Sequence, residues 1–179
     1  MARGKHYKKR QSFFKSSFFK SAFKIVLSVV LIASIVVNLF TFVFPIVKYY
    51  GKSMSPTYSD GQIMMVSALS EIERGDVIAF YYNNKILLRR VIALGNDQLS
   101  IDAFGKVSVN GKELKEGYAE KLTLGQCNIN FPYSVPTGSY FVLGDNREIA
   151  LDSRLEEIGA VTEDRLIGEV LFTIYPFDF

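Results

Sequence analysis

The sequence predicts a mainly β domain tethered by one N-terminal transmembrane helix. The helix is indicated by 23 consecutive uncharged residues, Ile25 to Val47. The β domain is indicated by short runs of β-branched and aromatic residues after this segment, separated by Gly, Asn, Asp and Pro. With 49% hydrophobic and 22% charged residues, the chain has enough apolar content to fold, which excludes a disordered polymer.

The apolar segment is long enough to cross a membrane, because a helix needs about 20 residues to span a hydrocarbon core of about 30 Å. A cleavable signal peptide would have an apolar stretch of only about 7 to 15 residues, so the longer run favours an uncleaved anchor over residues 25–47. The first 24 residues carry eight basic and no acidic side chains. The positive-inside rule therefore predicts a cytoplasmic tail over residues 1–24, in contact with anionic membrane lipid. Residues 48–179 are then expected outside the cell, attached to the plasma membrane.

Period-2 patterns and turn residues predict the strands of this outer domain. The expected strands cover residues 62–67, 76–82, 86–94, 98–102, 106–109, 140–143 and 166–175. Asn110-Gly111 predicts a two-residue hairpin turn, because both central positions of that turn favour positive φ. Short helices are expected around residues 69–73 and 162–165.

The counts of cysteine and histidine exclude several kinds of site. A single cysteine, Cys127, excludes an intrachain disulfide and a cysteine-based zinc site of ordinary spacing, and it fits a Gram-positive surface, where disulfides are sparse. The single histidine, His6, lies in the basic tail, which excludes a Ser-His-Asp triad in the outer domain. We therefore expect no metal and no organic cofactor. Because nothing beyond charge in the tail points to nucleic acid, no nucleic-acid partner is expected.

A candidate nucleophile follows the apolar segment, in Gly51-Lys52-Ser53-Met54-Ser55-Pro56-Thr57. A serine hydroxyl attacks a peptide carbonyl only when a base removes its proton and an oxyanion hole receives the developing charge. Without an outer histidine, the remaining base considered is a lysine kept neutral by burial in an apolar pocket.

Three further segments complete a recognisable set. They are Arg74-Gly75-Asp76-Val77-Ile78-Ala79-Phe80, then Arg89-Arg90-Val91-Ile92-Ala93-Leu94-Gly95-Asn96-Asp97, then Gly144-Asp145-Asn146-Arg147-Glu148-Ile149-Ala150-Leu151-Asp152-Ser153-Arg154. In this order, after a basic tail and one span, they resemble the type I signal peptidases. These are membrane-anchored Ser-Lys endopeptidases that release exported proteins from their signal peptides.

The resemblance implies a role for each matching residue. Ser53 matches the nucleophile, and its backbone amide would contribute to the oxyanion hole. An extended substrate would add as a strand beside residues 76–80. The implied substrate-binding residues are Met54, Asp76, Val77, Ile78, Ala79 and Phe80. The implied charged cluster that braces the active-site loop consists of Asp145, Asn146, Arg147, Asp152 and Arg154.

Two positions depart from the family pattern. The base lysine is replaced by Arg89, and a guanidinium, with a pKa of about 13.8, would need about 9 kcal/mol to be neutral at pH 7. The serine that orients the lysine is replaced by Ala150, which has no hydroxyl. Lys85 shares the strand face of Arg89 but lies about 13 Å away along an extended strand, and the side chain of Lys52 points away from that of its neighbour Ser53.

Two hypotheses about function therefore stay open. In the first, the chain is a serine endopeptidase that acts on the signal peptides of exported preproteins, with Ser53 as nucleophile. In the second, it is a proteolytically impaired accessory protein that binds surface or pilus proteins in a Gram-positive bacterium and assists their assembly. The intact Ser53 favours the first hypothesis, whereas Arg89 and Ala150 favour the second. The sequence carries no signal for the oligomeric state or the particular client.

Overall fold

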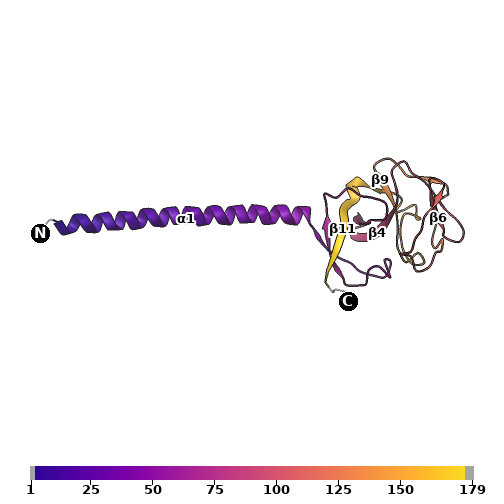
Figure 1. The fold of residues 1–179 in the computed structure, drawn as a ribbon, viewed down its shortest axis with the longest axis horizontal. Helices are drawn as coiled ribbons and strands as arrows, with labels where there is room; N and C mark the ends of the chain where they lie inside the picture. The colour runs from indigo at the N-terminus through magenta and orange to yellow at the C-terminus, as the bar shows by residue number, and fades with distance from the viewer. Residues whose placement is uncertain (1–2, 176–179) are drawn as a thin grey trace. The chain divides into compact units, whose positions relative to one another are not determined.

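The computed structural model of the chain describes the backbone of residues 3–175 and the side chains of residues 18–175. It divides into two compact units, one that ends at Phe42 and one that begins at Val43. The first unit is a single helix, and the second contains all the strands (Figure 1).

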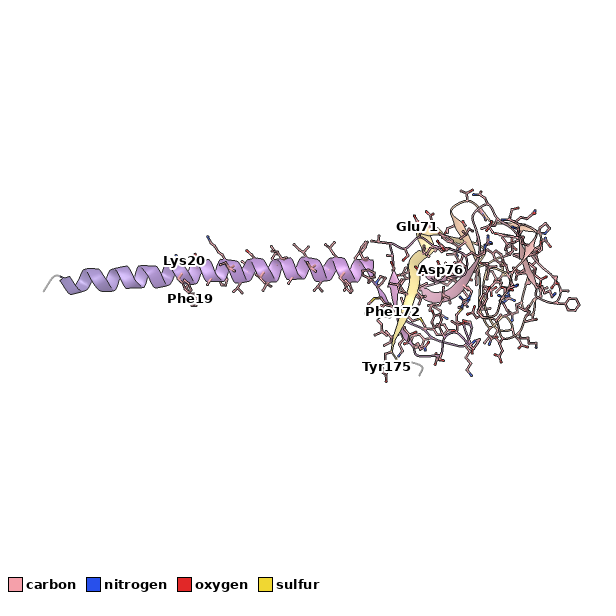
Figure 2. The ribbon with its side chains drawn as sticks, in the orientation of Figure 1. Phe19, Lys20, Glu71, Asp76, Phe172 and Tyr175 are labelled. Atoms are coloured by element: carbon pink, nitrogen blue, oxygen red, sulfur yellow. The ribbon has the colours of Figure 1, made fainter. Side chains whose placement is uncertain are left out.

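Helix α1 runs from Arg3 to Val43. Its segment Phe18–Val43 has a mean hydropathy of 2.6 over its most apolar window, none of which is buried, and is the one helix among the described residues that is long and apolar enough to cross a membrane. Side chains such as Phe19 and Lys20 project from it into open space (Figure 2). The helix ends before Pro45, which has no N–H to donate. Residues 46 and 47, assigned to the anchor by the sequence analysis, belong instead to strand β1.

Seven strands form the larger sheet, in the order β1-β2-β11-β3-β4-β9-β10. Their bounds are β1 Ile46–Lys48, β2 Ile63–Ser67, β3 Val77–Tyr82, β4 Lys85–Leu94, β9 Ser139–Leu143, β10 Val161–Thr162 and β11 Leu166–Tyr175. A second sheet of four strands has the order β7-β6-β5-β8. Its strands are β5 Gln98–Ile101, β6 Val107–Val109, β7 Lys112–Glu113 and β8 Tyr133–Ser134. The prediction of a mainly β domain is confirmed.

Of the short elements predicted from the sequence, the hairpin turn and one of the two short helices are present in the structure. Asn110 and Gly111 have φ of 51° and 77° and join the paired strands β6 and β7, as predicted. A short 3₁₀ helix, η1, covers Glu163–Arg165, within the segment expected to be helical. Residues 69–73 form no helix, which makes that prediction wrong. The segment is instead fixed by a turn, in which the Asp76 carboxylate accepts the Glu73 N–H at 2.7 Å.

Strand β4 is long enough to pair differently along its two halves. Its first half pairs with β3, from Lys85 opposite Tyr82 to Arg90 opposite Val77. Strand β9 pairs with its other edge only from Arg90 onward. Among the described strands, the edge of β4 from Lys85 to Arg89 on that side therefore has no partner.

Candidate active site

Ser53 lies in a turn that follows β1 and is hydrogen-bonded to the loop after β9. The turn is closed by backbone hydrogen bonds from Ser55 N to Lys52 O and from Tyr58 N to Met54 O, at 3.2 and 2.9 Å. Asn146 N donates to the Ser53 carbonyl at 3.0 Å, which joins this turn to the loop after β9. The Ser53 side chain is half-buried.

Gly144 allows this close approach of the two loops. A Cβ added at this residue would lie 2.6 Å from the Ser53 carbonyl oxygen and would also collide with the Cβ of Ala150. Only glycine leaves the space that the backbone of Ser53 occupies.

Arg89 places its guanidinium against the Ser53 hydroxyl. Its Nη1 donates to Ser53 Oγ at 2.8 Å and to the Leu88 carbonyl at 2.5 Å, while Nε donates to the Leu151 carbonyl at 2.8 Å. Burial lowers the pKa of Arg89, and the nearby Asp152 and Tyr49 oppose that shift. A guanidinium has donors only, so this group has no lone pair with which to accept the Ser53 proton.

Tyr49 supplies the other side-chain contact of Ser53, and the sequence analysis did not identify it. Its Oη lies 3.2 Å from Ser53 Oγ and accepts the Met54 N–H at 2.8 Å. The ring is 3% exposed and belongs to an apolar core cluster with Val47 and Met64. In the sequence, Val47 and Tyr49 flank the charged Lys48, and this period-2 pattern was the signal that could have placed the Tyr49 ring on the inner face of the chain.

The loop after β9 carries a fully buried charged cluster behind Ser53. Arg154 donates from Nε to Asp152 Oδ1 and from Nη2 to Asp152 Oδ2, both at 2.8 Å. Asp152 Oδ2 also accepts the Gly144 N–H at 3.0 Å. Ala150 is buried in the same loop, with its Cβ against Gly144. The implied bracing role of Asp152 and Arg154 agrees with this geometry, and it remains an assignment by geometry alone.

Asp145 and Arg147 are braced by partners that the sequence did not reveal. Asp145 pairs with Arg90 at 2.5 Å and accepts a hydrogen bond from the Thr57 hydroxyl. Burial by itself lowers the pKa of Arg90, but the hydrogen bond and charge of Asp145 outweigh it and raise that pKa. Arg147 pairs with Glu116 at 2.5 Å, where both side chains are buried. These pairs tie the loop to the Ser53 turn, to β4 and to the loop that contains Glu116.

The structure contradicts the expected substrate position over part of residues 76–80. β3 pairs with β4 along its whole length and with β11 at Ile78, Ala79 and Phe80. Both backbone edges of these three residues are therefore taken, so no strand can add along them. Val77 to Phe80 are buried, and Asp76 caps a turn at the start of β3, where Figure 2 labels it.

Neither Met54 nor the two alternative lysines form a hydrogen bond with Ser53 Oγ, although all three lie among the described residues. Met54 is fully buried in the apolar core, so it lines no exposed surface, contrary to the expectation. Lys52 and Lys85 are both exposed, and Lys85 pairs opposite Tyr82 at the far end of β4 from Arg89. Within residues 18–175, no group of three or more His, Cys, Asp and Glu side chains is placed to hold a metal ion.

Comparisons with known proteins agree with this fold and these motifs. The family described as signal peptidase, peptidase S26, matches residues 22–175. Signal peptidase I T of Bacillus subtilis (strain 168) is 30% identical over 92% of this chain and 89% of that protein. Signal peptidase I of Bacillus caldolyticus is 36% identical over 80% of this chain and 86% of that protein.

A solved structure is also similar. The crystal structure of a signal peptidase I from Enterococcus faecalis V583 is 29% identical, covers 58% of this chain and 99% of that chain, and has a TM-score of 0.47. The family match spans the C-terminal half of the helix, residues 22–43, and nearly the whole β domain. The chain belongs to the signal peptidase family, peptidase S26.

Proposed function

We propose that this chain is a membrane-anchored serine endopeptidase that cleaves the signal peptides of exported proteins, with the Ser53 hydroxyl as nucleophile. Family membership supports the reaction class. The observation that carries the proposal is the access to Ser53. Its side chain is half-buried, whereas the charged side chains of Asp145, Asp152 and Arg154 are fully buried. We infer from this difference that a peptide carbonyl reaches the Ser53 hydroxyl from solvent.

The proposed place for the substrate backbone is the free edge of β4 over residues 85–89. An extended peptide that adds to a sheet edge gains main-chain hydrogen bonds, and its alternate side chains enter pockets. This edge ends at Arg89, whose guanidinium contacts Ser53 Oγ at 2.8 Å, so a peptide bound along it brings a carbonyl near the nucleophile.

The apolar helix and the basic tail support a location at the plasma membrane, with the N-terminus in the cytoplasm and the β domain outside. The proposed partners are membrane lipid and exported preproteins. The Ser53 backbone amide is the proposed oxyanion donor, because it belongs to the residue whose hydroxyl attacks the carbonyl carbon.

The test is cleavage of a preprotein by the full chain in detergent micelles. Wild type is expected to release the signal peptide, and Ser53→Ala is expected to lose all cleavage. Ser59→Ala is the matched control, since Ser59 is an exposed serine nearby in the same loop, and it should cleave as wild type does. Cleavage that persists in Ser53→Ala would refute the role of this hydroxyl.

A second candidate function is a proteolytically impaired accessory protein that binds surface or pilus proteins. The observation that favours it is the donor-only guanidinium at 2.8 Å from Ser53 Oγ, together with the missing hydroxyl at Ala150. In this case neither wild type nor Ser53→Ala cleaves preprotein, and both complement a strain in which the gene is deleted.

Rebuilding the family dyad tests the part that residue 150 plays under the accessory hypothesis. Under the accessory hypothesis, Arg89→Lys combined with Ala150→Ser is expected to cleave preprotein at least about tenfold faster than Arg89→Lys alone, because the new hydroxyl orients the amine. Cleavage rates at neutral pH measure this difference. Equal rates in the two variants would mean that residue 150 does not orient the base.

A further inference from the structure

Arg89 is a buried cation that has no carboxylate partner among the described residues. Three arginines of residues 18–175 are buried, namely Arg89, Arg147 and Arg154. Arg147 and Arg154 each pair with a carboxylate, at 2.5 and 2.8 Å. The hydrogen bonds of Arg89 all go to uncharged oxygens, which belong to one serine hydroxyl and two backbone carbonyls. Because a buried charge is costly unless it is paired, Arg89 lacks the counter-ion that the other two arginines have.

One nitrogen of the Arg89 guanidinium is free to bind a ligand. Nε and Nη1 donate to protein oxygens, whereas Nη2 makes no hydrogen bond to any described residue. Every fully buried polar side-chain atom of residues 18–175 has a partner, so the unpaired Nη2 is open to solvent. Nη2 lies beside the Ser53 hydroxyl, because Nη1 of the same planar group contacts Ser53 Oγ at 2.8 Å.

The Ser53 and Tyr49 hydroxyls also have one proton more than their neighbours can accept. Arg89 donates to Ser53 Oγ, and the Met54 N–H donates to Tyr49 Oη. The gap of 3.2 Å between Oγ and Oη holds one O–H···O hydrogen bond, whichever oxygen donates. The other hydroxyl proton has no acceptor among the described residues. The site therefore offers a guanidinium nitrogen and a hydroxyl proton, both of which call for an acceptor.

A carboxylate at the end of a peptide fits these free donors. Its two oxygens can accept from both donors at once, and its charge supplies the missing counter-ion. The free edge of β4 over residues 85–89 ends at Arg89, so an extended peptide that runs along it parallel to β4 ends at the guanidinium. Ile86 on this edge and Leu151, whose carbonyl binds Arg89 Nε, are 40% and 48% exposed. These exposed apolar side chains favour an apolar peptide.

We propose that Arg89 and Ser53 bind the C-terminal carboxylate of an extended apolar peptide that lies along the free edge of β4. The place of the peptide backbone rests on the proposed function, under which the ligand is the signal peptide just released from its preprotein. One carboxylate oxygen accepts from Arg89 Nη2, and the other accepts the hydroxyl proton that Ser53 and Tyr49 leave unpaired. The bound carboxylate is the counter-ion that Arg89 otherwise lacks.

The first experiment measures the binding of two peptides to the full chain in non-ionic detergent micelles by isothermal titration calorimetry. Both are acetylated five-residue peptides of alternating alanine and valine, and one ends in a free carboxylate whereas the other ends in an amide. The acid is expected to bind at least about tenfold more tightly, because charge-assisted hydrogen bonds are about twice as strong as neutral ones. Equal dissociation constants would overturn the inference.

A third peptide tests whether the carboxylate must be the chain terminus. It ends in an amide and has glutamate as its last residue, so its charge lies on a side chain. It should bind no more tightly than the uncharged amide, because its carboxylate lies off the line of the backbone. Binding as tight as that of the acid would mean that the site recognises acidic side chains, which contradicts the proposal.

The matching variant is Arg89→Gln, which removes the cation and should bind the acid and the amide equally. Lys52→Gln is the control, since it removes the same charge from an exposed residue next to Ser53, and it should keep the wild-type preference. Thermal unfolding verifies that both variants are folded. A preference that persists in folded Arg89→Gln would refute the role of the guanidinium. Should Arg89→Gln not fold, the two peptides on wild type still decide the question.

Peptide binding needs no cleavage, so this inference and the proposed function fail separately. Ser53→Ala, which is expected to lose all cleavage, should still prefer the acid because Arg89 Nη2 remains. If wild type prefers the acid but cleaves no preprotein, the inference stands and only the proposed function is refuted. If wild type cleaves preprotein but binds the acid and the amide equally, only the inference is refuted.

Discussion

The guanidinium of Arg89 bridges three oxygen atoms, those of Ser53, Leu88 and Leu151. An arginine suits this position because its planar fork donates in several fixed directions, whereas a lysine presents one nitrogen. The same geometry removes proton transfer from residue 89. At the scale of single residues, any chemistry at Ser53 then depends on a proton acceptor other than Arg89.

Gly144 offers a direct test of the loop contact behind the nucleophile. In Gly144→Ala the new methyl group would collide with the Ser53 carbonyl and the Ala150 side chain, so the two loops must separate. We expect a loss of about 1–3 kcal/mol in the free energy of unfolding, typical of an overpacked site, and a greater loss of cleavage. Denaturant unfolding and preprotein cleavage measure the two effects.

Gly117→Ala is the control for this variant, because a Cβ at Gly117 meets nothing within 4 Å. It should leave both stability and cleavage near the wild-type values. If Gly144→Ala behaved like Gly117→Ala, the close approach of the Ser53 turn to the loop after β9 would be disproved.

At the scale of elements, the loop that contains Glu116 and Tyr118 links β4 to the loop after β9. The Tyr118 ring lies 4.2 Å from the Arg90 guanidinium carbon, and its hydroxyl donates to Glu116 at 2.9 Å. Glu116 in turn pairs with Arg147. This loop thus contacts β4 and the segment after β9 at once, which explains how a segment without regular structure keeps a fixed position.

The same loop makes stability sensitive to alkaline pH. Burial raises the pKa of Tyr118, and the adjacent Glu116 carboxylate raises it further. The unfolded chain releases this proton above about pH 10 while the folded chain keeps it, so the stabilisation is full below about pH 10 and is lost as pH rises beyond it. In Tyr118→Phe, the urea midpoint should fall less steeply than in wild type between about pH 9 and 11.

Tyr118→Phe also loses the hydrogen bond to Glu116. That loss lowers the urea midpoint by the same amount at every pH, so it does not change the slope of the midpoint against pH. Tyr81→Phe serves as the control, because Tyr81 is exposed, and its slope should equal that of wild type. Identical slopes for Tyr118→Phe and wild type would show that Tyr118 ionises freely in the folded domain.

At the scale of the whole molecule, the β domain begins earlier than the apolar run of the sequence suggests. Val43 O accepts the Ala68 N–H and Pro45 O accepts the Val66 N–H, both at 2.9 Å. β1 then pairs with β2 from Ile46 to Lys48. A fragment of residues 43–179 should therefore be more stable to unfolding than one of residues 49–179, by about 2 kcal/mol or more, since burial of Val47 alone approaches that value. Thermal and urea unfolding of the two fragments measure this, and equal stability would mean that β1 is dispensable.

The single cysteine provides a test of membrane topology. Cys127 is partly exposed in the β domain. With the β domain outside the cell, a membrane-impermeant maleimide should label Cys127 in intact cells. In the control, Cys127→Ser combined with Lys5→Cys, labelling should require lysis. Labelling of Cys127 only after lysis would reverse the proposed orientation.

Much of this molecule follows from local sequence patterns. The apolar run, the strand periods and the Asn110-Gly111 turn each act over a few residues, so they predicted the helix, the main strands and the hairpin. The motif order likewise implied that Ser53 and Arg89 meet, as they do. The helix end was placed four residues late, because the apolar character of the chain continues into β1.

What the sequence determined by itself is the class of the protein: one long apolar helix, one β domain, a serine, and a cation where a base is expected. Only the tertiary structure decided which edges and atoms are free. β3 is interior because β11 pairs with it from far along the chain, and Tyr49 reaches Ser53 because the turn after β1 folds back on itself. Such pairings depend on packing between distant segments, and the local hydrophobic periodicity of a strand does not predict them.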